Sequence, residues 1–284
     1  MPAINTVSVV GVGLIGGSFA LALRRVGFSG RIFGVSSPAT LARALDLGVI
    51  DRGSSLEEAL PRSDLVYMAQ PVTHIVDQLE QVSRLVPEHA LVTDAGSTKR
   101  RILERACEFF RGGADFVGGH PMAGKEGRGV EVAEAGLFNG ALYALVPIRG
   151  ALPDTPVMRT FLDWLDLMGC RQRVMDAAEH DTTVAWTSHM PQLVSTALAA
   201  TLGERLKSPG ELEVAGDGLR DMTRLAASPH GVWSAILETN GDAIDEALGS
   251  FVREVEGLRS ALSSNAGERH FRRANALRNR IEAS

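Results

Sequence analysis

A glycine-rich turn near the N-terminus has the spacing of a dinucleotide-binding loop. Residues 11–16 read GVGLIG and directly follow the valine-rich residues 7–10, VSVV. In this pattern Gly11 permits the tight turn, Gly13 lets the backbone approach a pyrophosphate, and Gly16 lets a helix pack close to the strand. The N–H groups of the first helical turn would then face the phosphates, so the pattern predicts a nucleotide cofactor here.

The end of the second apolar run bears on which dinucleotide is used. An acidic residue at this place normally binds the ribose 2′-hydroxyl of NAD and repels the 2′-phosphate of NADP. Here residues 32–35 are followed by Ser36 and Ser37, with no carboxylate. We therefore expect NADP to be accepted and preferred, with NAD usable. The predicted cofactor-binding residues are Gly11, Gly13, Leu14, Ile15, Gly16, Ser36, Ser37, Gln70 and Pro71.

Two further polar segments follow apolar runs and could carry the chemistry. Residues 93–99 read TDAGSTK, and residues 118–124 read GGHPMAG. The carboxyl ends of parallel strands converge on the cofactor crevice, so Ser97 and His120 should both lie near the nicotinamide. A histidine there can take a proton from a substrate hydroxyl while hydride leaves the same carbon.

Residues 187–192, TSHMPQ, place a proline inside a strongly helical stretch. Pro191 cannot donate to the carbonyl of Thr187, so we expect a kink at this point. His189 and Gln192 are three residues apart and should share a helix face near that kink.

Residues 218–224, GLRDMTR, contain two arginines, Arg220 and Arg224. The planar guanidinium group binds a carboxylate through two parallel hydrogen bonds. The segment therefore predicts a cationic site for an anionic substrate.

The four segments TDAGSTK, GGHPMAG, TSHMPQ and GLRDMTR occur in the order found in the prephenate/arogenate (cyclohexadienyl) dehydrogenase family. The chain resembles that family over roughly residues 7–260, and GGHPMAG matches the family's catalytic-histidine motif without a change. The resemblance implies NAD(P)-dependent oxidative decarboxylation of prephenate or arogenate, on the route to tyrosine.

The resemblance also implies roles for particular residues. His120 would accept a hydrogen bond from the substrate's C4 hydroxyl, with Ser97 beside it, and Arg224 would hold the ring carboxylate. Glu126 would gate or line the pocket, and Trp233 would reach the pocket of a neighbouring subunit. The implied substrate-binding residues are Arg224, Arg220, His189, Gln192, Glu126 and Trp233.

Three positions depart from the family pattern. Lys125 stands where Ser or Thr is usual, and Leu219 replaces a Phe. Gln192 stands where members that prefer prephenate often have His. Because an amide both donates and accepts hydrogen bonds, Gln192 favours arogenate or dual use and leaves the substrate choice open.

The elements that must position these residues alternate in the first part of the chain. Strands are predicted at residues 7–10, 31–35, 65–69, 90–93, 115–118, 141–146 and 171–175, with helices between them at 18–25, 41–47 and 99–110. This alternation predicts a Rossmann-like doubly wound α/β domain over residues 1–175.

The second part of the chain has helical patterns only. Helices are predicted at residues 182–206 and 242–262, with breaks at 208–210 and 216–218. We expect an all-helical domain for substrate and dimerisation over residues 176–284. Apolar helix faces with no sheet to cover predict a homodimer.

Composition excludes several classes of protein. The formal net charge of −5 argues against a nucleic-acid partner, and no apolar run is long enough for a membrane span. The first residues have no signal-peptide pattern, so a cytoplasmic enzyme is expected. Cys107 and Cys170 form no metal-binding spacing, so we expect two buried, reduced thiols and no metal.

Two alternatives to this family are considered. One is a β-hydroxyacid dehydrogenase-like oxidoreductase, whose relatives lack GGHPMAG and the histidine–proline segment. The other is a non-catalytic NAD(P)-binding sensor, which should have lost His120 or Arg224, and both are present.

Overall fold

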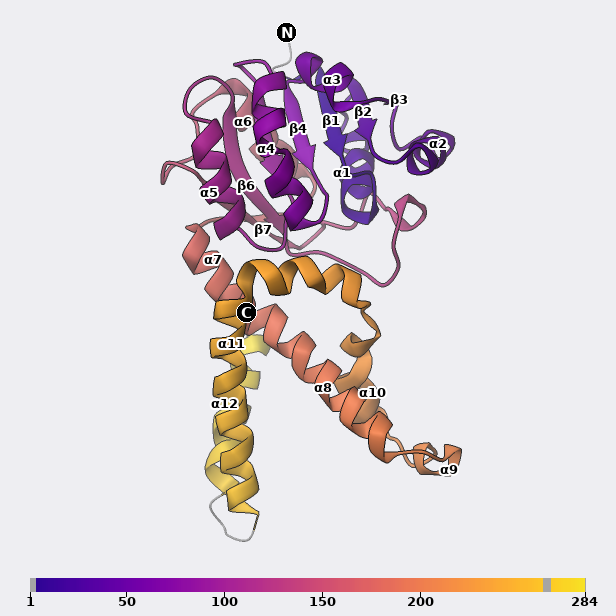
Figure 1. The fold of residues 1–284 in the computed structure, drawn as a ribbon, viewed down its shortest axis with the longest axis vertical. Helices are drawn as coiled ribbons and strands as arrows, with labels where there is room; N and C mark the ends of the chain where they lie inside the picture. The colour runs from indigo at the N-terminus through magenta and orange to yellow at the C-terminus, as the bar shows by residue number, and fades with distance from the viewer. Residues whose placement is uncertain (1–3, 263–266, 284) are drawn as a thin grey trace.

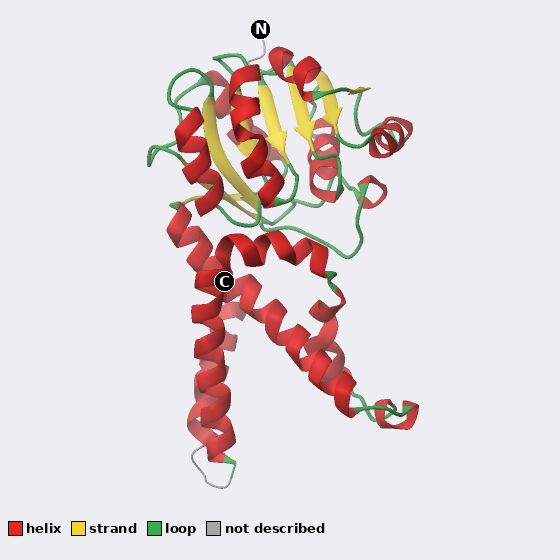
Figure 2. Cartoon of the chain, viewed as in Figure 1, coloured by secondary structure: helices red, strands yellow, loops and turns green. Residues whose placement is uncertain are grey.

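The structure is a computed structural model that describes residues 4–262 and 267–283. An α/β domain lies above an all-helical part in which two arms diverge from the underside of the sheet (Figure 1). Most of the strand arrows point toward the helical part, so the carboxyl ends of those strands face it (Figure 2).

Eight strands form one sheet, in the order β3-β2-β1-β4-β5-β6-β7-β8. All neighbouring strands are parallel except β6 and β7, which are antiparallel. The strands are β1 (Thr6–Val10), β2 (Arg31–Val35), β3 (Arg52–Gly53), β4 (Leu65–Met68), β5 (Leu91–Asp94), β6 (Asp115–Pro121), β7 (Leu142–Pro147) and β8 (Arg171–Val174).

Helices cover both faces of the sheet, which accounts for the continuous apolar runs in its central strands. Phe19 of α1 and Phe161 of α6 belong to the core on one face, while Leu79 of α4 and Ile102 of α5 belong to the core on the other. The helices of this domain are α1 (Leu14–Arg25), α2 (Pro38–Asp46), α3 (Leu56–Ala59), α4 (Val72–Leu85), α5 (Arg100–Phe109), α6 (Pro156–Leu167) and the short 3₁₀ helices η1 (Leu60–Arg62) and η2 (Val130–Val132).

The rest of the described chain is helical. Its elements are α7 (Ala177–Val184), the π-helix η3 (Ala185–His189), α8 (Met190–Arg205), α9 (Pro209–Leu212), α10 (Asp217–Thr223), η4 (Arg224–Ala227), α11 (His230–Ala261) and α12 (Glu268–Glu282). The long α11 runs below the sheet and then turns down into one arm, beside α12 (Figure 1). Its one residue with non-helical backbone angles is Asn240 (φ −134°, ψ 23°), and this marks the turn.

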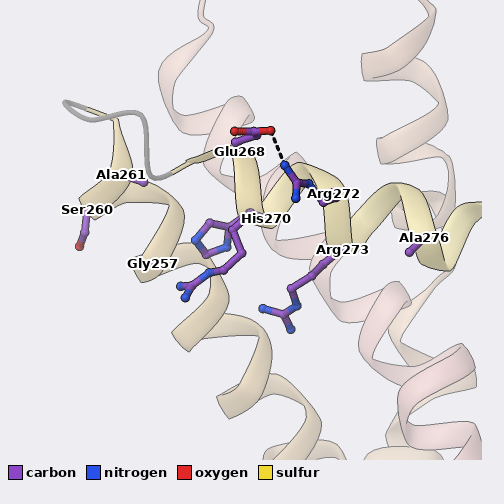
Figure 3. A pocket seen from close by; sticks show the side chains of 9 residues that line it. Gly257, Ser260, Ala261, Glu268, His270, Arg272, Arg273 and Ala276 are labelled. Atoms are coloured by element: carbon purple, nitrogen blue, oxygen red, sulfur yellow. Dashed lines mark hydrogen bonds and ion pairs between the residues drawn. The ribbon is translucent and has the colours of Figure 1, made fainter.

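A groove lies where α12 returns along α11 (Figure 3). It is lined by Gly257, His270, Arg269, Arg272 and Arg273, among others. None of the predicted site residues lines it.

The predicted doubly wound fold and helical second part are confirmed, with two local corrections. The edge strand β3 was not predicted, since two residues carry no periodic signal. The expectation of two buried thiols is wrong for Cys107, which is exposed on the outer side of α5, and right for Cys170. Every helix in the described part of the chain is too short or too polar to span a bilayer.

Candidate active site

The glycine loop connects β1 to α1 as predicted. Gly11 has φ +95°, and a Cβ there would lie 2.7 Å from the Ala69 carbonyl oxygen at the end of β4. A Cβ on Gly16 would collide with the Gly11 carbonyl oxygen, so this contact between helix and loop requires glycine. A Cβ on Gly13 would meet nothing within 4 Å, which leaves the space in front of the helix open.

This open space fits a dinucleotide. No side chain in the described structure caps the N-terminus of α1, so its first N–H groups remain available to a phosphate. Beside the loop, Gln70 has a buried Oε1 with no hydrogen-bond partner among the described residues. A bound cofactor could supply that missing donor.

The end of β2 carries the two predicted serines, which the structure treats differently. Ser36 is half-buried, with no carboxylate beside it in sequence. Ser37 caps α2, since its Oγ accepts a hydrogen bond from the Thr40 N–H at 3.3 Å. Arg43 pairs with Glu131 at 3.7 Å. The Ser37 hydroxyl is therefore engaged in capping α2, and Ser36 is the better candidate to bind the ribose 2′ substituent.

His120 lies near the carboxyl end of β6, and Ser97 lies in the loop that follows the adjacent strand β5. It is half-buried, as a base that must meet a substrate requires. Burial lowers the pKa of His120 well below its usual value, and nearby groups that can carry positive charge lower the pKa further. His120 is thus a neutral base at neutral pH.

A second histidine contacts His120. His120 Nδ1 lies 2.8 Å from His180 Nε2, and His180 Nδ1 lies 2.7 Å from Asp181 Oδ1. His180 and Asp181, from the first turns of α7, are 1% and 0% exposed. Three side chains therefore form one hydrogen-bonded chain across the boundary between the sheet and the helical part.

A buried ion pair supports the strand that carries His120. Lys99 Nζ donates to the Asp94 carboxylate and, at 2.7 Å, to the Gly119 carbonyl oxygen. Both charged side chains are fully buried. Burial lowers the pKa of Lys99, and the charge of Asp94 opposes that effect.

The segment around Pro191 departs from a simple kink. Residues Ala185–His189 form a π-turn in which the Met190 N–H donates to the Ala185 carbonyl, five residues back. The widened turn ends at His189, two residues before Pro191, whose missing N–H cannot serve the preceding turn. The helix interruption expected at this proline is therefore present, in the form of a π-bulge.

The π-turn directs His189 toward α11. The His189 ring packs edge-on against Trp233 at 5.9 Å, and its Nδ1 lies 3.3 Å from Asn240 Nδ2. Burial lowers the pKa of His189 to about 4. Gln192 is 4% exposed, and its amide donates to the Leu225 carbonyl at 2.8 Å. That bond ties Gln192 to the residue that follows Arg224.

The two predicted cationic residues are both exposed to solvent. Arg220, in α10, and Arg224, in η4, are exposed, and neither forms an ion pair within the described chain. Glu126 is exposed in the loop after β6. Its neighbour Lys125 pairs with Glu134 at 2.9 Å, which offsets the extra positive charge in that loop.

Comparison with protein families matches the chain to two consecutive models. The nucleotide-binding domain of prephenate dehydrogenase matches residues 19–172, and the dimerization domain of prephenate dehydrogenase matches residues 176–275. The chain belongs to the prephenate dehydrogenase family.

Individual members of the prephenate dehydrogenase family are similar over nearly the whole chain. The Bacillus subtilis prephenate dehydrogenase is 34% identical over 272 residues, 94% of this chain and 73% of that protein. The A. aeolicus prephenate dehydrogenase in complex with hydroxyphenyl propionate and NAD+ is 30% identical, with a TM-score of 0.86 over 98% of both chains. The Synechocystis arogenate dehydrogenase is 28% identical, with a TM-score of 0.80 over 97% of this chain and 99% of that one.

Membership of the prephenate dehydrogenase family makes the protein an NAD(P)-dependent oxidoreductase of the prephenate and arogenate class. The β-hydroxyacid dehydrogenase and the non-catalytic sensor are therefore set aside. Four buried residues around His120 were not predicted from the sequence: Asp94, Lys99, His180 and Asp181. The one sequence signal for the last two was an adjacent His–Asp pair in the first helix after the sheet.

Proposed function

We propose that the protein oxidises and decarboxylates both prephenate and arogenate, with His120 as general base and NADP or NAD as hydride acceptor. The observation that carries this proposal is the position of His120. It stands at the carboxyl edge of the sheet, with a low pKa and with Nδ1 bonded to a buried partner, so that Nε2 remains for the substrate. Ser97, on the adjacent loop, lies on the same edge.

The chemistry assigns a task to each part of the site. The dinucleotide, when bound, supplies the hydride acceptor. His120 takes the proton of the ring hydroxyl, and the O–H electron pair becomes the C=O bond as the carbon loses hydride. The new carbonyl is conjugated to the carbon that bears the carboxylate, so loss of CO₂ yields an aromatic ring. Arg224 would orient that carboxylate. Because Arg224 is exposed, it would not form a buried ion pair that neutralises the carboxylate.

Steady-state kinetics with both substrates, each with NAD and with NADP, test the proposed function. We expect turnover of prephenate and of arogenate within a hundredfold of each other in kcat/KM. Absence of turnover with both would refute the function. A preference above a hundredfold for either substrate would refute dual use.

Arg224→Ala should raise the KM for the cyclohexadiene substrate by about 10- to 150-fold, as for a lost charge-assisted hydrogen bond. The KM for the dinucleotide should change little, because Arg224 is assigned to the substrate carboxylate and not to the dinucleotide. Arg220→Ala is the matched control, and we expect a smaller effect on the same KM. A larger effect at Arg220 would reverse the two assignments.

Ser36→Asp should shift the cofactor preference toward NAD by at least about tenfold in the ratio of kcat/KM values, equal to about 1.4 kcal/mol. The added carboxylate would accept a hydrogen bond from a 2′-hydroxyl and repel a 2′-phosphate. For the wild type we propose acceptance of both dinucleotides with NADP preferred. Ser37→Asp is the control, since that hydroxyl caps α2. Strict NAD dependence of the wild type would contradict the proposed role of Ser36.

We also propose a homodimer formed through a helical domain that begins at residue 176, in a cytoplasmic enzyme. The two arms of that domain diverge (Figure 1) and leave large apolar side chains exposed. The dimerization-domain model matches residues 176–275, which supports a homodimer formed through this domain. Light scattering at micromolar concentration should give the mass of two chains, and the mass of one chain would contradict the dimer. The exposed apolar residues on α11 and α12 are Val232, Val252, Val255, Leu258, Phe271, Leu277 and Ile281.

A further inference from the structure

His120, His180 and Asp181 are linked by hydrogen bonds, and the protonation of Asp181 determines which atom donates in each of them. Asp181 is fully buried, and burial by itself raises its pKa. Hydrogen bonds from His180 and from the backbone N–H groups of Arg100 and Lys99, at 2.9 and 2.7 Å, outweigh burial and keep the pKa below its usual value. Asp181 is therefore ionised at neutral pH, and an ionised carboxylate can only accept.

Because the Asp181 carboxylate can only accept, it determines which ring nitrogens of His180 and His120 carry a proton. Because Asp181 accepts, His180 Nδ1 must carry a proton. A neutral His180 then has a lone pair on Nε2, 2.8 Å from His120 Nδ1, so His120 donates its Nδ1 proton there. The remaining lone pair of His120 is on Nε2, the atom that faces away from His180.

We propose that His180 and Asp181 are positioning residues for the reaction: they hold His120 in the tautomer whose Nε2 is the base, and they stabilise the imidazolium that forms when that atom takes the substrate proton. This inference rests on the proposed role of His120 as general base. When the substrate O–H bond breaks and the Nε2–H bond forms, the positive charge is shared along the hydrogen bonds to His180 and opposed by Asp181. The same logic orders the groups in a serine protease triad.

The site is built to hold this chain in place. Asp181 also accepts from the backbone at the start of α5, which has no side-chain cap of its own. The Asn240 amide donates to the Asp181 carbonyl at 2.9 Å. Asp181 therefore fastens α7 to the α/β domain and to the turn in α11, so its orientation is tied to the packing of both domains.

Charged side chains from several elements lie near these three hydrogen-bonded residues, and each positive charge is paired with a carboxylate. Lys99 lies beside His120 but is paired with Asp94 of β5. Arg100 of α5 contacts Asp181 at 3.4 Å and pairs with Asp242 of α11.

The other neighbours add no fixed charge to the two rings. His189 of the π-turn is kept neutral by its low pKa. Glu179 of α7 pairs with Arg173 on the surface, at 2.7 Å. On β7 the residue opposite His120 is Ala144.

Nitrogen-15 NMR of the free, histidine-labelled wild-type enzyme tests the assignment without any substrate. His120→Asn and His180→Gln difference spectra identify the two rings. We expect His120 to be protonated at Nδ1 only, and His180 also at Nδ1 only, at neutral pH. A His120 protonated at Nε2, with a doubly protonated His180, would overturn the proposal. This readout does not depend on turnover, so it separates the inference from the proposed function.

Kinetics of His180→Leu and His180→Gln provide the second test. We expect His180→Leu to lower kcat by about 10- to 100-fold, with little change in the KM for the dinucleotide. Gln has an amide oxygen that can accept from His120, so His180→Gln should retain more activity. His89→Leu, which removes a histidine from an exposed pair with Asp64 at 3.1 Å, is the control and should leave kcat unchanged.

The pH profile distinguishes this role from a structural one. A neutral His180 that accepts from His120 stabilises the imidazolium, so its loss should move the acid limb of kcat/KM to lower pH. Loss of a charged His180 would move the limb to higher pH, because a repelling cation is removed. An unshifted limb or a shift to higher pH would overturn the proposal.

Discussion

His120→Asn should lower kcat by about 10²- to 10⁴-fold, the range for loss of a general base. Asn cannot take the hydroxyl proton, while its amide still reaches the place of the ring Nδ1. Substrate and dinucleotide KM should therefore change much less than kcat. Stopped-flow or steady-state measurement of dinucleotide reduction gives both parameters.

The wild-type pH profile gives the same prediction a second readout. Since burial holds the pKa of His120 well below 6.5, kcat/KM should stay on its plateau as pH falls through 6.5. It should decline only at lower pH, as the base becomes protonated. The control is His89→Asn, which replaces an exposed histidine near the opposite edge of the sheet. Near wild-type kcat in His120→Asn would remove His120 from the mechanism.

Lys99→Met should lower the free energy of unfolding by about 3–5 kcal/mol, the cost of breaking a buried ion pair. Met fills much of the same volume but leaves the Asp94 charge buried without its cation. It also removes the donor to the Gly119 carbonyl, next to His120. Denaturant unfolding at a fixed protein concentration measures the loss.

The double variant Lys99→Met with Asp94→Asn is the informative comparison. Asn removes the buried charge and keeps one of the two oxygens that accept from the backbone N–H groups of Gly96 and Gly119 in the wild type. We expect the double variant to be more stable than Lys99→Met alone. A loss below about 1 kcal/mol in Lys99→Met, or additive losses in the double variant, would show that the pair contributes little.

Several features of the fold could be predicted because their causes are local. The close contacts at Gly11 and Gly16 depend on a turn of six residues, and the amphipathic spacing of Ile102 and Ala106 in α5 depends on one helix. The two-residue strand β3 was not predicted, because so short a strand has no periodic pattern of apolar residues. The widened turn at Ala185–His189 was predicted only as a kink, because a proline removes a donor without specifying how the helix adjusts.

The sequence by itself determined the family and the glycine loop, and it is the source of the proposal that His120 is the base, since each of these lies in a short segment whose spacing has a direct physical meaning. Only the tertiary structure decided which side chains are hydrogen-bonded to His120 and to its partner. His180 is 60 residues from His120, and the Asp181 carboxylate caps a helix 82 residues earlier in the chain. Such contacts depend on how one domain packs on the other, and no local periodicity encodes that packing. The tautomer of His120 is consequently a property of the folded interface between the two domains.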